Sequence, residues 1–274
     1  MSNLYIVPQE TLDFSSPDYL FYNVHNDKQN TYLIKHINCK NVVIETDAIQ
    51  LTAYGIPRIN EDYCPSDAYR EYIMLPFDLS QSSCVTLKDT MKRADEYFAS
   101  LPFKIKLFGS KAGKHMYHPI IRSKSFREED DSDDDNYIPK KNLPMDYCKV
   151  KFIMNYDSNG KKINETKTVL KTNGEAIEVK TITDLSNYIK FRSVAKYTIM
   201  FQKIWACKTP VPGSNFFMYG AGLTILEINT GRHTPISVDL SNPIYELDKL
   251  KEMYKEYMDG KKKLVKKCHN VIEI

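Results

Sequence analysis

The chain has 274 residues, of which 42% are hydrophobic and 27% are charged, a composition that suits a folded core and excludes a wholly disordered chain. Its 38 basic and 35 acidic residues leave a formal net charge of +3. No apolar run approaches a membrane span, and the first residues lack the basic-then-apolar pattern of a signal peptide. The six cysteines form no CxxC pair, which favours free thiols in a reducing compartment over a disulfide frame or a zinc site. We therefore predict an intracellular protein.

The first predicted elements are strands. Residues 1–40 suggest short edge strands with loops, and the β-branched stretch 41–54 predicts a strand that ends in a turn at Gly55. Residues 72–79 predict a further strand, and Pro76 indicates an edge or a bend.

A helix is predicted next. Thr86 and Asp89 have capping-box spacing, and the helix should be interrupted at Pro102. Its apolar positions recur every three or four residues and are Leu87, Met91, Ala94 and Phe98.

The segment 109–146 has no sustained periodicity and contains an acidic run. Seven of the eight residues from 128 to 135 are acidic, namely Glu128, Glu129, Asp130, Asp131, Asp133, Asp134 and Asp135. Without these seven residues, the chain has 28 acidic and 38 basic residues, a net charge of +10. Like charges repel and stay solvated, so we expect a mobile acidic loop at about 124–142 on a basic body. A basic body favours polyanionic partners.

The C-terminal half predicts more strands and two short helices. The alternation over 147–154 predicts a strand, and Asp157–Gly160 a hairpin turn. A short helix is expected within 181–189, capped by Thr183 with Asp184. Strands are then predicted at 190–206 and 220–229, joined by the loop 209–215.

Near the end, Asn242 and Pro243 predict the start of a helix that stops at Gly260. The order of elements predicts an α+β, mainly β domain built on a β barrel over residues 1–260, followed by a basic C-terminal tail at 261–274.

The stretch 188–228 interleaves aromatic and basic residues. Aromatic faces can stack on exposed bases while cations follow the phosphates of a single strand. The stacking candidates are Tyr197, Phe201, Trp205, Phe216, Phe217 and Tyr219. The phosphate-binding candidates are Lys190, Arg192, Lys196, Lys203 and Lys208, with Arg122 and Lys124 as outlying help.

Ordinary core packing is the alternative interpretation of these aromatics. Strict alternation places Tyr197, Phe201, Lys203 and Trp205 on one face, so some of them must lie in the core. Phe216 and Phe217, in a loop beside Gly213, are the better candidates for base contact.

Catalytic patterns are weak. His115 and His118 could bind a metal, and Glu45 and Asp47 could share one, but solvated side chains are the commoner outcome. No Walker, GxSxG or HExxH motif is present. We predict no catalytic residues, no metal and no cofactor.

Several segments together resemble a known family. The first segment is DAIQLTAYGIP at 47–57. Three more follow in order within 179–228, namely VKTITDLSNYIKFRS, IMFQKIWACK and YGAGLTILEI. They resemble a group of proteins from nucleocytoplasmic large DNA viruses (giant viruses), related to the phage T7-type single-stranded DNA-binding proteins. The resemblance implies an OB-fold core, which is a five-stranded Greek-key barrel with helical insertions, acting in viral replication.

In the phage relatives an acidic segment closes the chain and competes with DNA for the basic groove. Here the acidic run is internal and the C-terminus is rich in lysine, which puts the tail-dependent partner contacts of that family in doubt. We hypothesise that residues 128–135 imitate the phosphate backbone when DNA is absent.

The expected function is non-enzymatic, largely sequence-independent binding of single-stranded DNA in viral replication, recombination or repair, in the viral factory of the host cytoplasm. One alternative is an OB-fold structural or interaction protein of a viral factory or virion core without DNA binding. Another is an enzyme that uses Glu45 and Asp47 with a divalent ion. RNA binding, viral replication proteins as partners and a homodimer stay open, and no membrane partner is expected.

Overall fold

Two long antiparallel strands form the centre of this computed structural model. They are β14 (Val194–Cys207) and β15 (Phe217–Thr230), each fourteen residues long. Aromatic and β-branched residues are frequent in both, which suits strands that pack on a core. The prediction of two paired strands joined by a loop is confirmed, although β14 begins later and β15 earlier than expected.

The structure describes residues 3–24, 29–61, 63–123, 145–159 and 161–231. Lys124, the acidic run 128–135, the helix expected after Pro243 and the tail 261–274 lie outside the described residues. No helix in the described part of the chain is long and apolar enough to cross a membrane.

Thirteen of the described strands share one sheet, whose main path runs β1-β4-β3-β14-β15-β12-β13. The N-terminal strands are β1 (Leu4–Ile6), β2 (Tyr19–Val24), β3 (Gln29–His36), β4 (Asn41–Glu45) and β5 (Ile49–Gln50). The later ones are β6 (Tyr72–Pro76), β7 (His115–His118), β8 (Ile121–Arg122), β9 (Tyr147–Phe152), β12 (Val169–Thr172) and β13 (Glu175–Ile177).

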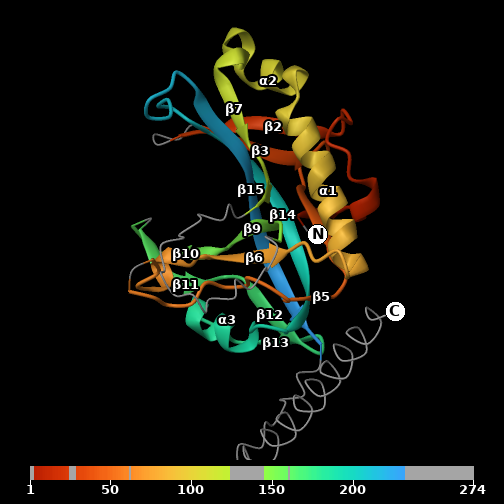
Figure 1. The fold of residues 1–274 in the computed structure, drawn as a ribbon, viewed down its shortest axis with the longest axis vertical. Helices are drawn as coiled ribbons and strands as arrows, with labels where there is room; N and C mark the ends of the chain where they lie inside the picture. Colours follow the sequence, from red (N-terminus) through yellow and green to blue (C-terminus); the bar gives the residue numbers. More distant parts are fainter. Residues whose placement is uncertain (1–2, 25–28, 62, 124–144, 160, 232–274) are drawn as a thin grey trace, which may run out of the picture. The chain divides into compact units, whose positions relative to one another are not determined.

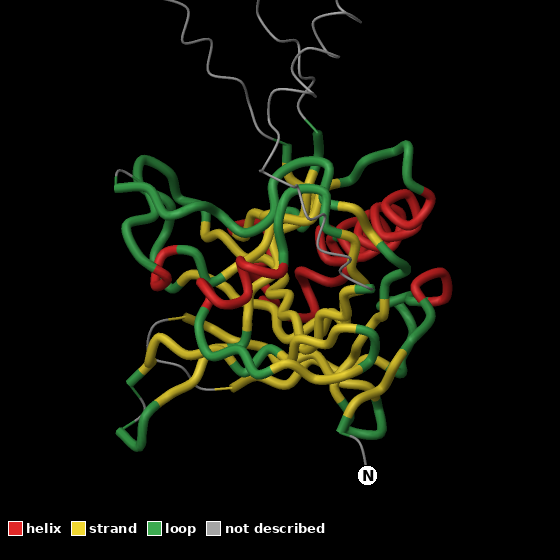
Figure 2. Tube along the Cα trace, turned by 90° about the horizontal axis from the view of Figure 1, so that it is seen from below, coloured by secondary structure: helices red, strands yellow, loops and turns green. Residues whose placement is uncertain are grey.

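The sheet curls because its two long strands change partners along their length. β14 pairs in turn with β5, β4 and β3, and β15 pairs with β7, β9 and β12. Seen from below, the strands wrap around the centre of the molecule (Figure 2). The fold is therefore mainly β, as predicted, with a curled sheet and few helices.

The predicted strand 41–54 is interrupted after β4. Thr46 leaves the ladder, and its side-chain Oγ1 accepts a hydrogen bond of 2.9 Å from the backbone nitrogen of Tyr197. The predicted hairpin at Asp157 is confirmed, with β10 (Met154–Tyr156) and β11 (Lys162–Thr166) as its antiparallel strands.

The predicted helix with one apolar face is α1 (Ser82–Ala99), and its four periodic positions are all buried. Its start at Thr86 was wrong, since the N-cap is Gln81. The Gln81 side chain exchanges two hydrogen bonds with the backbone of Gln50 on β5, a tertiary contact that local sequence does not reveal.

A second helix follows the first directly. α2 (Leu101–Phe108) is capped by Ser100, whose side chain accepts a hydrogen bond from the backbone of Phe103, and Pro102 lies in its first turn. α2 leads into the short 3-10 segment η3 (Gly109–Lys114) and then β7 (Figure 1). Gly109 adopts a φ of 56°, which turns the chain at the end of α2.

The short helix α3 (Ile182–Tyr188) lies in the predicted range, but its cap is Thr181 rather than Thr183. Thr181 and Asp184 form the capping box. The Thr183 hydroxyl instead joins a network with the nearly buried pair Asp67 and Arg70, whose closest atoms are 2.7 Å apart. That network ties α3 to the loop before β6.

Candidate functional site

Three of the predicted stacking residues belong to the core. Tyr197, Phe201 and Tyr219 are each 0% exposed. The Tyr219 hydroxyl donates to the Phe98 carbonyl of α1, and the Phe201 ring lies 4.9 Å from that of Phe14. A fully buried ring cannot stack on a base, so the expectation of base contact is corrected for these three.

A bulge in β14 separates the core aromatics from Lys203 and Trp205. Phe201 pairs with Leu223 of β15, whereas Lys203 pairs with the very next residue of β15, Gly222, so Gln202 is extra. One extra residue sends every later side chain to the opposite face. The prediction that Phe201, Lys203 and Trp205 share a face was therefore wrong: the buried positions after the bulge are Ile204 and Ala206.

On the outer side, Lys203 and Trp205 join side chains from neighbouring strands. On β9, Cys148, Val150 and Phe152 are buried, so the alternate residues point outward. We call the resulting surface the basic face; its residues are Tyr72 of β6, Arg122 of β8, Lys149 and Lys151 of β9, and Lys203 and Trp205 of β14.

The strand pairings connect these residues in space. Lys151 pairs with Tyr72 on one side and with Thr224 of β15 on the other. Two positions along β15 from Thr224, Gly222 pairs with Lys203. Arg122 pairs with Tyr147, which precedes Lys149 by two residues on β9.

The cations of the basic face influence one another. Burial lowers the pKa of Lys149, and the charges of Arg122 and Lys151 lower it further. Burial also lowers the pKa of Lys203, again with a contribution from Lys151. The Lys149 Nζ lies 3.4 Å from the centroid of the Tyr72 ring, a cation–π contact.

The charge of this face is not neutralised within the described part of the chain. There, none of Arg122, Lys149, Lys151 and Lys203 forms an ion pair with a carboxylate. The Arg122 Nε is buried and has no hydrogen-bond partner among the described atoms. Crowded, unpaired cations of this kind favour an anionic partner.

Two glycines of β15 allow the half-buried Trp205 and Lys203 to lie against the sheet. A Cβ on Gly220 would be 2.9 Å from Cζ2 of Trp205 and 2.9 Å from the carbonyl oxygen of His118. A Cβ on Gly222 would be 3.2 Å from Cγ of Lys203. Gly220 thus provides room for the Trp205 indole, and Gly222 provides room for the Lys203 stem.

The remaining predicted cations lie elsewhere. Lys190, Arg192 and Lys196 are exposed at or before the start of β14, and the Arg192 guanidinium lies 5.5 Å from the ring of Phe191. At about 3.3 Å per residue, Lys196 is roughly 23 Å from Lys203 along β14, and Arg192 lies before the first residue of that strand. The structure does not bring these three cations together with Lys203.

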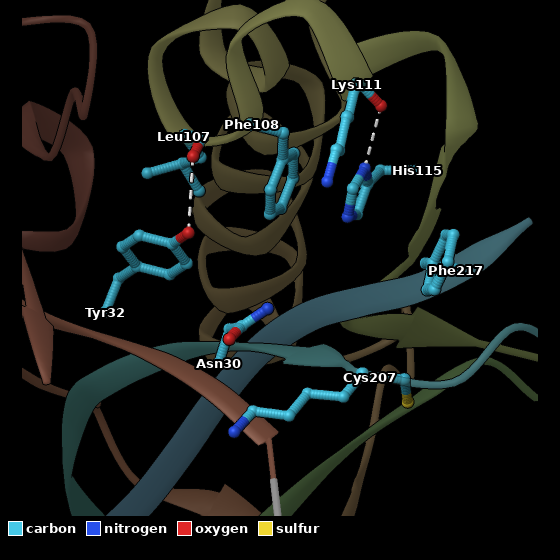
Figure 3. Close-up of a pocket in the computed structure, with 9 residues that line it drawn as sticks. Asn30, Tyr32, Leu107, Phe108, Lys111, His115, Cys207 and Phe217 are labelled. Carbon is cyan, nitrogen blue, oxygen red and sulfur yellow. Dashed lines mark hydrogen bonds between the residues drawn. The ribbon is translucent and has the colours of Figure 1, made fainter. Parts of the chain in front are cut away.

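A cleft of about 400 Å³ opens where β14 ends and β15 begins (Figure 3). We call it the ring cleft; the residues that line it are Asn30, Tyr32, Leu107, Phe108, Lys111, His115, Cys207, Lys208 and Phe217. The residues that line it include the predicted Lys208 and Phe217. Phe216, which precedes Phe217 in the chain, is 48% exposed.

The walls of the ring cleft are ordered by ring contacts. The Phe108 and His115 rings stack with centroids 3.7 Å apart and an angle of 2°, and Phe217 lies 5.5 Å from His115. The Tyr32 hydroxyl donates to the carbonyl of Leu107 at 3.2 Å (Figure 3). These contacts hold the end of α2 against the sheet.

The candidate metal ligands are separate. His115 and His118 each direct Nδ1 to a backbone carbonyl oxygen, of Lys111 and Pro119 respectively. Glu45 and Asp47 are exposed on either side of the buried Thr46. Within the described residues, no three His, Cys, Asp or Glu side chains form a group that could hold a metal ion.

Sequence reasoning missed several residues of both surfaces. Lys149 and Lys151 were visible in the alternation of YCKVKF, whose polar positions had to face away from the core. Tyr32, Phe108 and Lys111 carried no comparable signal, because strands and helices far apart in sequence bring them together.

No protein-family model matches the chain. Over 248 residues, which are 83% of this chain, it is 32% identical to an uncharacterized protein of Acanthamoeba polyphaga mimivirus. The match spans 61% of that relative's length. The chain is thus similar to a giant-virus protein, which supports the viral part of the resemblance seen in the sequence.

Proposed function

We propose that this protein binds single-stranded DNA without catalysing a reaction and largely independently of base sequence. The observation that carries the proposal is the basic face, where four cations from three strands lie beside a half-buried Trp205. Cations spaced along a surface match a phosphate backbone, and aromatic rings offer stacking platforms that every base can use.

A single strand fits this face better than a duplex. The bases of a duplex are stacked on one another, so the flat Trp205 and Tyr72 rings would have no free base to contact. A curled, mainly β sheet can present such a face, and we retain the OB-like Greek-key barrel as the proposed finer description of the fold. The proposed setting is viral DNA replication, recombination or repair in the host cytoplasm.

Titration of labelled oligo-dT, followed by fluorescence anisotropy at several salt concentrations, tests the proposal. We expect binding that weakens with salt, with a log–log slope of about −3, since four phosphate contacts contribute roughly −0.7 each. A duplex of equal length should bind more weakly. No binding at micromolar protein in low salt would instead favour the alternative, a structural or interaction protein.

The acidic run gives a second test of the proposal. Its segment joins β8 to β9, so its ends are tethered next to Arg122 and Lys149, although residues 128–135 themselves lie outside the described part. If the run competes with DNA for the cations, deletion of 128–135 should raise oligo-dT affinity and steepen its salt dependence. Unchanged affinity and slope in the deletion variant would reject the competition.

A further inference from the structure

The ring cleft is separate from the basic face and has the features of a small-molecule site. Its volume of about 400 Å³ lies in the usual range for ligand pockets, roughly 300 to 1,000 Å³. Rings and one aliphatic side chain form most of its wall. Among the described residues that line it, Lys111 directs its amine into the cleft and none is a carboxylate, so the cleft favours an anion with a flat apolar part.

Polar groups in the ring cleft add hydrogen-bonding capacity. The Nδ1 of His115 lies 2.9 Å from the carbonyl oxygen of Lys111, and a carbonyl can only accept, so Nδ1 carries the hydrogen. In the neutral ring this leaves Nε2 as an acceptor. Asn30 supplies both an amide donor and an amide acceptor to the same cleft.

We propose that the ring cleft binds one nucleotide, with the base against the rings of Phe108 and Tyr32 and the phosphate at the amine of Lys111. A base offers a flat π face and edge groups that hydrogen-bond, and the phosphate of the nucleotide carries the charge that Lys111 attracts. Figure 3 shows the Lys111 amine pointing into the cleft beside the Phe108 and His115 rings.

Two sources could supply this nucleotide. One is a free nucleoside monophosphate, and the other is the terminal unit of a bound strand, in which case the inference rests on the proposed function. The register favours a free nucleotide: Tyr32 of the cleft pairs with the buried Ile204, so it lies on the face of the sheet opposite Trp205.

Calorimetric titration of the full-length protein with thymidine 5′-monophosphate tests the site. The variant is Lys111→Ser, at an exposed position, and the matched control is Lys92→Ser, an exposed lysine outside the cleft. We expect the cleft variant to bind the nucleotide at least about tenfold more weakly, since it loses the charge-assisted phosphate contacts. Thymidine without phosphate should bind both variants equally.

The source is identified by repeating the titration with saturating oligo-dT. Loss of nucleotide binding assigns the cleft to the end of a strand, and retained binding assigns it to a free nucleotide. The proposal is overturned if the wild-type protein does not bind the nucleotide or if the two variants bind it equally. The variant Lys151→Gln with Lys203→Gln should keep nucleotide binding while losing oligo-dT, so the two proposals fail separately.

Discussion

The double substitution Lys151→Gln and Lys203→Gln is expected to weaken oligo-dT binding about a hundredfold, because each change removes a charge-assisted contact worth roughly a factor of ten. The salt dependence should become shallower by about 1.4 in log–log slope, at roughly 0.7 for each lost phosphate contact. Anisotropy titrations at three or more salt concentrations measure both quantities.

The fold should tolerate these changes. Lys151 is exposed, and burial already disfavours the charge of Lys203, as its lowered pKa shows. Glutamine keeps the Cβ and Cγ methylene groups of either side chain. Equal thermal denaturation of variant and wild type would verify that only the surface has changed.

The matched control is Lys92→Gln with Lys180→Gln, which alters the net charge equally. Lys92 is on α1 and Lys180 precedes α3, and their side chains are 68% and 70% exposed. Both form exposed ion pairs, which contribute little to stability. If the two double variants bind oligo-dT with the same affinity and slope, the basic face is not the binding surface.

The second large effect is expected from Gly220→Ala. The new Cβ would lie 2.9 Å from the Trp205 ring and 2.9 Å from a backbone oxygen of β7, and the backbone cannot move aside cheaply. We expect the free energy of unfolding to fall by about 1 to 3 kcal/mol, as for other overpacked sites. Urea denaturation followed by the emission of Trp205, the one tryptophan of the chain, measures this change.

Gly222→Ala is the matched control for that substitution. Its Cβ would meet a flexible lysine side chain at 3.2 Å, and Lys203 can shift by a few tenths of an ångström. Its stability should therefore change less than that of Gly220→Ala, and its Trp205 emission should stay as in the wild type. Equal losses of stability in the two variants would contradict the role assigned to Gly220.

Local signals predicted most of the elements but fewer of their ends. The apolar period from Leu87 to Phe98 identified α1, since four side chains on one helical face need only the helix itself to line up. The start of α1 depends instead on the hydrogen bond between Gln81 and Gln50. The Thr183 side chain bonds to Asp67 and does not cap α3. Such partners are distant in sequence, so propensity alone could not identify them.

The functional surfaces were predictable in part. The stretch 188–228 contains Lys203, Trp205, Lys208 and Phe217, which belong to the basic face and the ring cleft. Their partners come from β6, β8 and β9 for the face, and from β3, α2 and β7 for the cleft. Only the pairing of strands and the packing of α2 on the sheet place those segments side by side.

The sequence by itself determined that β14 is a strand, that its residues alternate, and that the chain outside residues 128–135 is basic. The tertiary structure alone decided which side of the alternation faces the core. Because of the bulge at Gln202, Phe201 and Lys203 lie on opposite faces of the sheet although they are two residues apart. The bulge arises from the register of β14 against β15. Because a register belongs to two strands at once, no reading of one strand could show that Trp205 faces outward.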